Sequence, residues 1–173
     1  MPKQKKEKHI INCDKAPFVP EGWSVEDHQK GGQLLWSPAK VALFLADAQK
    51  TGRIGGHDLR KILGSHRVLN ANVLDYLLAN PSLIPEEWKG KYVYFWGTIY
   101  RDRDGSLYVR YLCWDGGRWS WNYYWLGNDW CSTNPAAVLA RSSKKLKPSH
   151  LDTLSLEVKI NGKVYFGEVK LKV

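Results

Sequence analysis

The sequence of 173 residues lacks several features that would define a protein class at once. Its three cysteines are odd in number and include no closely spaced pair, so we expect no disulfide framework or zinc knuckle, and a Cys113–Cys131 bridge is the one pairing left open. No apolar run approaches the eighteen or so residues of a membrane helix. The basic N-terminus is not followed by the apolar segment of a secretory signal. We therefore expect a globular, cytoplasmic protein with no membrane partner.

The sequence also has few groupings of catalytic or metal-binding side chains. Its five histidines are scattered, and His57 and His66 do not share a helix face, which argues against a metal pair. Glu86 and Glu87 follow Pro85, where carboxylates favour a helix N-terminus electrostatically. The segment 102–105 lacks the later ligands and the closing glutamate of a calcium loop. We expect no catalytic residues, no metal and no cofactor, and therefore no enzyme.

The formal net charge of +9 lies mainly at the two ends of the chain. Residues 1–15 carry five Lys/Arg against two Asp/Glu, and residues 141–173 carry eight against three. Residues 16–140 carry thirteen against twelve. Because basic tails are often only solvated, this distribution does not by itself indicate a dedicated nucleic-acid domain.

Aromatic residues are abundant in one segment. Fourteen of the twenty-two aromatic residues lie between Tyr92 and Trp130. Tyrosine and tryptophan combine a large contact area with a polar group, so such a segment builds a heavy core or a recognition surface.

Patterns of spacing and breakers predict helices in the first half and strands in the second. Ser37–Pro38 and the apolar spacing after it predict a helix over 38–50. Further helices are expected over 57–63 and over 71–79, the latter capped by Asn70 or Asn72, with one more helical turn at Pro85–Trp88. Strands are expected over 92–100, 107–114 and 118–126, with turns at 102–105 and 115–117, and a C-terminal hairpin turns at Asn161–Gly162.

These elements predict an α+β fold, with three short N-terminal helices packed on an antiparallel β-meander. A C-terminal β-hairpin joins the edge of this sheet or stands beside it. Residues 1–33 are expected to form a basic tail and an irregular lead-in. Residues 34–173 are expected to form a single α+β domain with a helical part (37–88), the meander (92–130) and the hairpin (153–173).

Strand alternation assigns the aromatic residues to two faces. We assign Val93, Phe95, Val109 and the tryptophans of 119–125 to the core, so Trp121→Ala should cost about 3–5 kcal/mol. The opposite face combines Tyr, Trp, Arg, Ser and Asn, as adaptable binding surfaces do, or else it covers another sheet or the hairpin. The candidate ligand-binding residues are Tyr92, Tyr94, Trp96, Arg110, Ser120, Asn122, Tyr124 and Asn128.

Several segments occur in a recognisable order. The order is LIPEEWKGK (83–91), FWGTIYR (95–101), WxW followed by WL (119–126), and NPAAVLA (134–140). In these segments the chain resembles a group of short bacterial proteins without an established activity, common in reduced-genome candidate phyla. Its Trp/Asn/Tyr-rich segment is also similar in character to the variable segments of diversity-generating retroelement target proteins. That resemblance implies substitutable Asn, Tyr, Ser and Asp residues on a fixed tryptophan frame, usually within a C-type-lectin-like fold.

Together these features predict a non-catalytic recognition module. We expect it to bind an unknown protein or carbohydrate ligand through the Tyr/Asn/Ser-rich face and the adjacent loop Gly127–Asn134, and to be a diversified binding protein if the retroelement resemblance holds. The alternative is a single-stranded nucleic-acid-binding protein that uses its basic tails and aromatic stacking.

Overall fold

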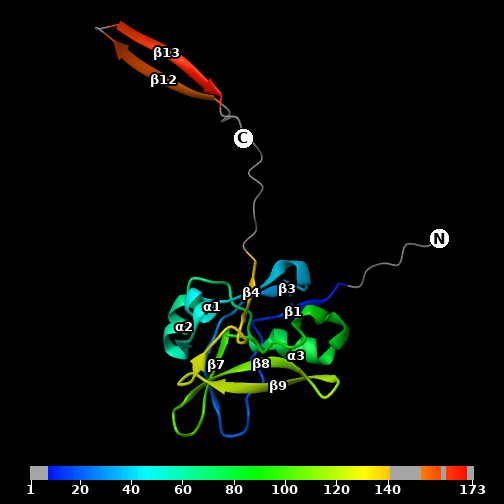
Figure 1. Cartoon of the computed structure of the whole chain (residues 1–173). Coiled ribbons are helices and arrows are strands. Elements are labelled where there is room, and N and C mark those ends of the chain that lie inside the picture. Colours follow the sequence, from blue (N-terminus) through cyan, green and yellow to red (C-terminus); the bar gives the residue numbers. More distant parts are fainter. Residues whose placement is uncertain (1–7, 141–152, 161–162, 171–173) are drawn as a thin grey trace, which may run out of the picture. The chain divides into compact units, whose positions relative to one another are not determined.

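The computed structural model describes residues 8–140, 153–160 and 163–170, in two compact units, Met1–Ala140 and Arg141–Val173 (Figure 1). The second unit contains the predicted hairpin, in which β12 (Thr153–Ile160) pairs antiparallel with β13 (Lys163–Lys170). The predicted turn at Asn161–Gly162 and residues 171–173 of the return strand lie outside the described residues. The division after residue 140 differs from the single domain that we expected over 34–173.

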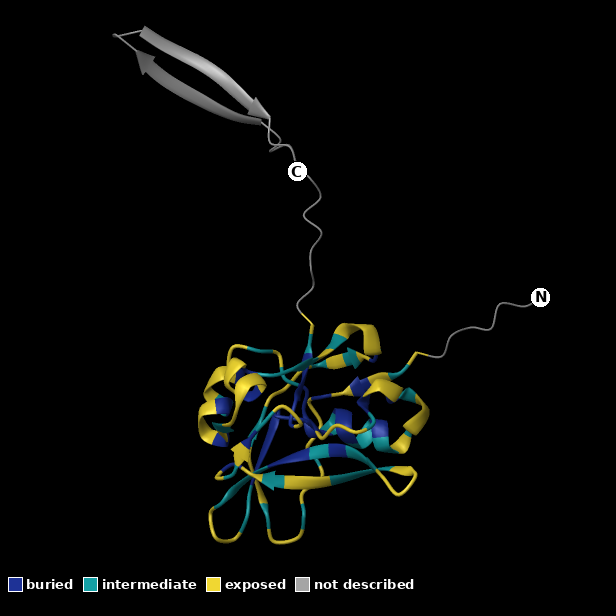
Figure 2. Ribbon diagram, in the orientation of Figure 1, coloured by how far each residue is buried: buried dark blue, intermediate teal, exposed yellow. Residues whose placement is uncertain are grey.

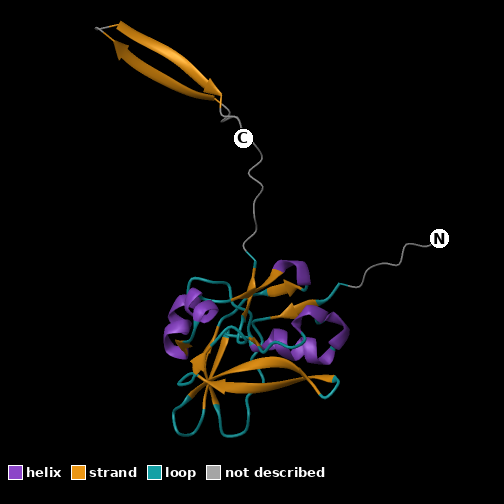
Figure 3. Ribbon diagram, in the orientation of Figure 1, coloured by secondary structure: helices purple, strands orange, loops and turns teal. Residues whose placement is uncertain are grey.

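A curled mixed sheet forms the centre of the first unit (Figure 3). The β6–β11 pair is parallel and the other pairs are antiparallel. In spatial order the strands are β2 (Ser24–His28), β7 (Thr98–Arg101), β8 (Leu107–Asp115), β6 (Val93–Tyr94), β11 (Ala136–Leu139) and β4 (Val41–Phe44), and β9 (Arg118–Trp125) pairs with β8. Two short ladders accompany this sheet: β1 (Ile10–Asn12) with β3 (Gln33–Leu35), and β5 (Ile54–Gly55) with β10 (Asp129–Trp130).

The helices are short, and all of them lie between strands of the first unit along the sequence. They are α1 (Asp47–Thr51), α2 (Gly56–Leu63) and α3 (Ala71–Ala79), with 3₁₀ turns at Pro38–Lys40, Pro81–Leu83 and Glu86–Trp88. The predicted fold class, α+β with an N-terminal helical layer on a meander, is therefore wrong, because the protein is mostly β. None of the helices in the described part of the chain is long and apolar enough to cross a membrane.

The largest local error concerns the predicted helix over 38–50. Pro38 does begin a 3₁₀ turn, but Val41–Phe44 form β4, which pairs with β11, and helix α1 begins only at Asp47. A short apolar run fits a strand as well as a helix, and pairing with a distant strand decides between them. The lead-in over 1–33 is likewise not irregular throughout, since β1 and β2 lie within it.

Other local predictions are confirmed. Helices α2 and α3 match their predicted ranges within one residue, and the Asn70 side chain caps α3 by accepting a hydrogen bond from the Asn72 N–H. The strand predicted over 92–100 is interrupted, because the chain kinks between β6 and β7. Gly97 lies in this kink, where an added Cβ would approach the Asn70 Cβ and backbone to within 3 Å, so the close packing of the two segments requires glycine.

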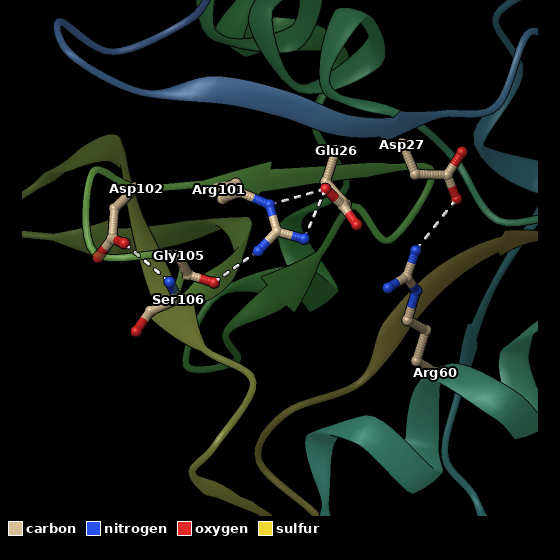
Figure 4. Close-up of polar contacts among 7 residues, drawn as sticks. All are labelled: Glu26, Asp27, Arg60, Arg101, Asp102, Gly105 and Ser106. Atoms are coloured by element: carbon tan, nitrogen blue, oxygen red, sulfur yellow. Dashed lines mark hydrogen bonds and ion pairs between the residues drawn. The ribbon is translucent and has the colours of Figure 1, made fainter.

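The β7–β8 turn carries a polar network that ties β2 to the sheet (Figure 4). Arg101 donates through Nε and Nη2 to Glu26 Oε2 at 2.9 and 2.8 Å, and through Nη1 to the Gly105 carbonyl at 2.9 Å. Asp102 Oδ1 accepts from the Ser106 N–H at 2.9 Å. The predicted turn is therefore confirmed, and Arg101 links it to the neighbouring strand.

The β8–β9 register corrects the predicted faces. Asp115 pairs with Arg118, so odd-numbered residues of β8 lie opposite even-numbered residues of β9. The tryptophans of β9 consequently share a face with Arg110 and Leu112, whereas Val109 shares the other face with Tyr124. The predicted core face, which joined Val109 to these tryptophans, is wrong.

Each face of the sheet instead packs against its own core (Figure 2). On one side, Leu74 and Leu77 of α3 pack with Leu112. On the other, Leu59 of α2 packs with Trp130, both completely buried. The sheet therefore lies between two helix-covered cores, and the tryptophans of β9 are half-buried or exposed rather than central.

Candidate functional site

Two adjoining pockets form a groove on the Val109–Tyr124 face of the β8–β9 ribbon. They share Tyr92 and Tyr111, and each encloses about 350 Å³. We call this site the tyrosine groove. Its first pocket is also lined by Arg53, Tyr94, Tyr124, Asp129, Cys131, Thr133 and Asn134. Its second is also lined by Cys113, Asp115, Ser120 and Asn122, and it is bordered by Trp114 and Trp121, which belong to the opposite face of the ribbon by register.

Aromatic rings in edge-to-face and tilted contacts give the groove a fixed wall. The rings of Tyr92 and Tyr111 meet nearly at right angles, with centroids 5.5 Å apart, and the Tyr94 ring lies 4.9 Å from that of Tyr111. Tyr94 and Tyr124 both pack on the buried ring of Trp130, at 4.5 and 5.0 Å. Because these side chains project from paired strands onto a buried tryptophan, their orientation is set before any ligand arrives.

The tyrosine hydroxyls supply the polar chemistry of the groove. Tyr94 accepts a hydrogen bond from Asn134 Nδ2 at 3.3 Å, and Tyr124 donates to the Asp129 carbonyl at 3.3 Å. Burial raises the pKa of Tyr94 and of Tyr111 above the ordinary phenol value. Both remain neutral near pH 7, so they present phenol hydroxyls that can donate and accept.

The loop from Asp129 to Asn134 closes one end of the groove. Gln49, which is buried, donates through Nε2 to the carbonyls of Cys131 and Asn134 at 3.1 and 3.0 Å. Asn134 Oδ1 in turn accepts from the Cys131 N–H at 2.9 Å. These hydrogen bonds hold the loop through its backbone carbonyls and through the Asn134 side chain, although the loop contains no helix and only the short strand β10.

A cysteine thiol lies at this end of the groove. Cys131 Sγ is 3.2 Å from Thr133 Oγ1, and this hydrogen bond lowers the pKa of the thiol, with smaller contributions from the backbone N–H of Thr133 and from the Arg53 charge. Burial instead raises the pKa of Cys13 and of Cys113. All three cysteines are free, so the Cys113–Cys131 bridge left open by the sequence does not form.

The structure brings together five of the eight candidate residues. Tyr92, Tyr94, Ser120, Asn122 and Tyr124 line the groove, although Tyr94 is almost completely buried. The predicted loop also contributes, through four of the residues between Gly127 and Asn134.

The other three candidates lie elsewhere. Trp96 is buried and packs on Trp130 at 4.7 Å. Arg110 lies on the opposite face, where it is buried, pairs with Asp75 at 2.8 Å and stacks 4.0 Å from the Trp121 ring. Asn128 follows β9 in a turn, and its carbonyl accepts from the Gly56 N–H. The predicted face therefore mixed groove residues with residues of both cores.

Sequence reasoning missed Tyr111 and Arg53 as residues of the groove. A signal for Tyr111 was present, because the two-residue loop Gly116–Gly117 fixes the pairing of Asp115 with Arg118 and hence the face of every residue in β8. No local pattern indicates Arg53. It precedes β5, whose pairing with β10 brings distant segments together.

Comparisons with known proteins add no identity to this geometry. No family model matches the sequence, and neither curated proteins nor solved structures give a match. Within the described residues, no group of three or more His, Cys, Asp or Glu side chains is arranged to hold a metal ion.

Proposed function

We propose that the protein is a non-catalytic recognition module whose ligand binds in the tyrosine groove. The observation that carries this proposal is the gathering of four tyrosines in one pocket, which adjoins a second pocket that Ser120 and Asn122 line and shares Tyr92 and Tyr111 with it. Such a surface offers stacking area and neutral hydrogen-bonding groups at a low entropic cost. Its ligand is a carbohydrate or an extended protein segment, since both present polar groups beside apolar faces.

The contacts of Cys131 support binding rather than catalysis. Many catalytic thiols are activated by an adjacent base that a third group orients. The Cys131 thiol contacts Thr133 and Asn134, and within residues 8–140 no histidine or carboxylate hydrogen-bonds to it. The groove therefore holds a thiol of lowered pKa without the hydrogen-bonded base of a nucleophile–base pair.

Paired variants test the groove directly. We expect the wild-type chain to bind members of a glycan array or a displayed peptide library. Ser120→Ala/Asn122→Ala should weaken that binding at least tenfold and leave the unfolding midpoint unchanged, since neither side chain is part of a core. The matched control is Gln33→Ala/Ser82→Ala, because both residues are exposed and outside the groove. Equal binding by wild type and the groove variant would exclude this site.

A second function is favoured by aromatic rings on the other face of the ribbon. Trp23 packs at 4.6 Å on both Tyr108 and Tyr123, and Tyr123 and Trp125 are 40% and 44% exposed. Exposed rings of this kind can stack unpaired bases, and the basic ends of the chain add phosphate attraction. A salt titration separates the two functions, because nucleic-acid binding weakens steeply as salt rises and binding in a neutral groove does not.

A further inference from the structure

A second pocket, remote from the tyrosine groove, has a different chemical character. It encloses about 350 Å³ and shares no residue with the groove. One wall is the segment Arg67–Leu69, which pairs with β11: the Leu139 N–H donates to the Arg67 carbonyl, the Leu69 N–H donates to the Ala137 carbonyl, and Val68 forms a bridge with Val138. Backbone pairing thus fixes this wall whatever the side chain at position 67.

The floor of the pocket is equally fixed. Asn70 lies there, almost completely buried, and its Nδ2 donates to the carbonyls of Cys13 and Gln29 at 2.8 and 3.0 Å. His28 Nε2 lies 3.1 Å from the same Cys13 carbonyl. The pocket is therefore formed by a hydrogen-bonded junction of three distant segments and does not depend on a loop free to collapse.

The pocket lining is basic and apolar. Lys30, His66 and Arg67 contribute basic groups, and Leu34, Val68 and Leu139 contribute apolar surface. Among the described residues, none that lines it is Asp or Glu, and neither Lys30 nor Arg67 forms a salt bridge. The nearby carboxylate of Asp14 accepts a hydrogen bond from the Gly32 N–H at 2.9 Å.

His66 is oriented by its own surroundings. Its ring packs on that of Phe44 at 4.1 Å, and Nδ1 lies 3.2 Å from the Ile62 carbonyl. Nδ1 also lies 3.2 Å from Ser65 Oγ, so within the described residues the ring makes its hydrogen-bonding contacts through Nδ1. Nε2 is then the ring nitrogen left to interact with a ligand.

We propose that this pocket binds a small organic anion, a phosphate monoester joined to an apolar group. Arginine presents a planar set of donors that matches phosphate oxygens, and lysine adds a positive charge. Two cationic side chains, Lys30 and Arg67, suit a phosphate dianion better than a singly charged carboxylate, and the three aliphatic side chains suit the apolar part of the ester. This site does not depend on the function proposed for the tyrosine groove.

Titration of the full-length chain with phenyl phosphate tests the proposal. We expect saturable shifts of the His66 ring resonances, with binding at least fivefold tighter than that of inorganic phosphate or benzoate, and no saturation with phenol. Failure of phenyl phosphate to saturate, or equal binding of benzoate, would overturn the proposal.

Variants locate the binding. Arg67→Ala and Lys30→Ala should each weaken phenyl phosphate binding at least fivefold without lowering the unfolding midpoint, because both side chains are exposed. Lys91→Ala is the matched control, since it removes an exposed charge outside the pocket, and it should bind as wild type does. Binding unaffected by Arg67→Ala, or an oligonucleotide that binds through Arg67 where phenyl phosphate does not, would contradict a small-molecule site.

Discussion

The two faces of the β8–β9 ribbon carry the same kinds of aromatic residue, but on one face they pack around a buried ion pair and on the other they line a groove. On the α3 side, Trp121 stacks on the buried guanidinium of Arg110, which pairs with Asp75. On the α2 side, Tyr94 and Tyr124 pack on Trp130 and leave a groove above them. Aromatic density therefore does not define a binding surface. The two faces differ in how their rings are packed. On the α2 side the tyrosine rings pack on buried Trp130 and also line a pocket.

The largest expected effect compares one tryptophan from each side. Trp130 is completely buried, whereas Trp121 is half-buried. Trp130→Ala should lower the free energy of unfolding by about 4 kcal/mol, and Trp121→Ala by about 2 kcal/mol, less than the sequence suggested, because less apolar area is lost. Chemical denaturation measures both. A larger loss for Trp121→Ala than for Trp130→Ala would show that the α3 side, and not the α2 side, contains the more important aromatic core residue.

The buried ion pair sharpens the contrast between the faces. Asp75→Ala leaves the Arg110 side chain, 2% exposed, without its carboxylate and should cost about 3 kcal/mol in denaturant unfolding. The control is Asp47→Ala, which removes the exposed Asp47–Lys50 pair and should leave the unfolding midpoint unchanged. If both variants unfolded with wild-type stability, Arg110 would not be a structural element of the α3 face.

A smaller effect belongs to the groove itself. Tyr94→Phe keeps the ring on Trp130 but removes the oxygen that accepts from Asn134 Nδ2. The loss should be about 1 kcal/mol, the usual contribution of a single hydrogen bond. Tyr123→Phe is the matched control, since Tyr123 is exposed on the opposite face. Equal stability of the two variants would show that the Asn134 contact does not hold the loop in place.

How far the sequence predicts this molecule depends on the range of the interactions. Asn70 caps α3 through a neighbour two residues away, and the β12–β13 hairpin depends on adjacent strands, so local patterns found both. Strand β4 depends on pairing with β11, about ninety-five residues later. The apolar pattern of Val41–Phe44 gives no information about that pairing. The groove was predicted in part because alternation along each strand is local. The predicted set of groove residues was wrong where the register between β8 and β9 decides which face a residue lies on, as for Arg110.

The smallest effect leaves stability unchanged and tests the chemistry at the end of the groove. Because the Thr133 hydrogen bond lowers the pKa of Cys131, this thiol carries a larger thiolate fraction below its ordinary pKa. Iodoacetamide should therefore label Cys131 before Cys113 and Cys13, whose pKa values are raised by burial. Peptide mass spectrometry of samples labelled at pH 7.5 measures the order.

Thr133→Val removes the side-chain donor and should slow the labelling of Cys131 at pH 7.5, while at high pH, where every accessible thiol is ionised, the variant and wild type should react alike. A ligand that fills the groove should protect Cys131 and leave Cys13, which is buried beside the basic pocket, unaffected. Protection of Cys13 by such a ligand would mean that the two pockets are coupled. Labelling that is unchanged by Thr133→Val would exclude the hydroxyl as the cause and leave the backbone N–H of residue 133 and the charge of Arg53 as the remaining causes.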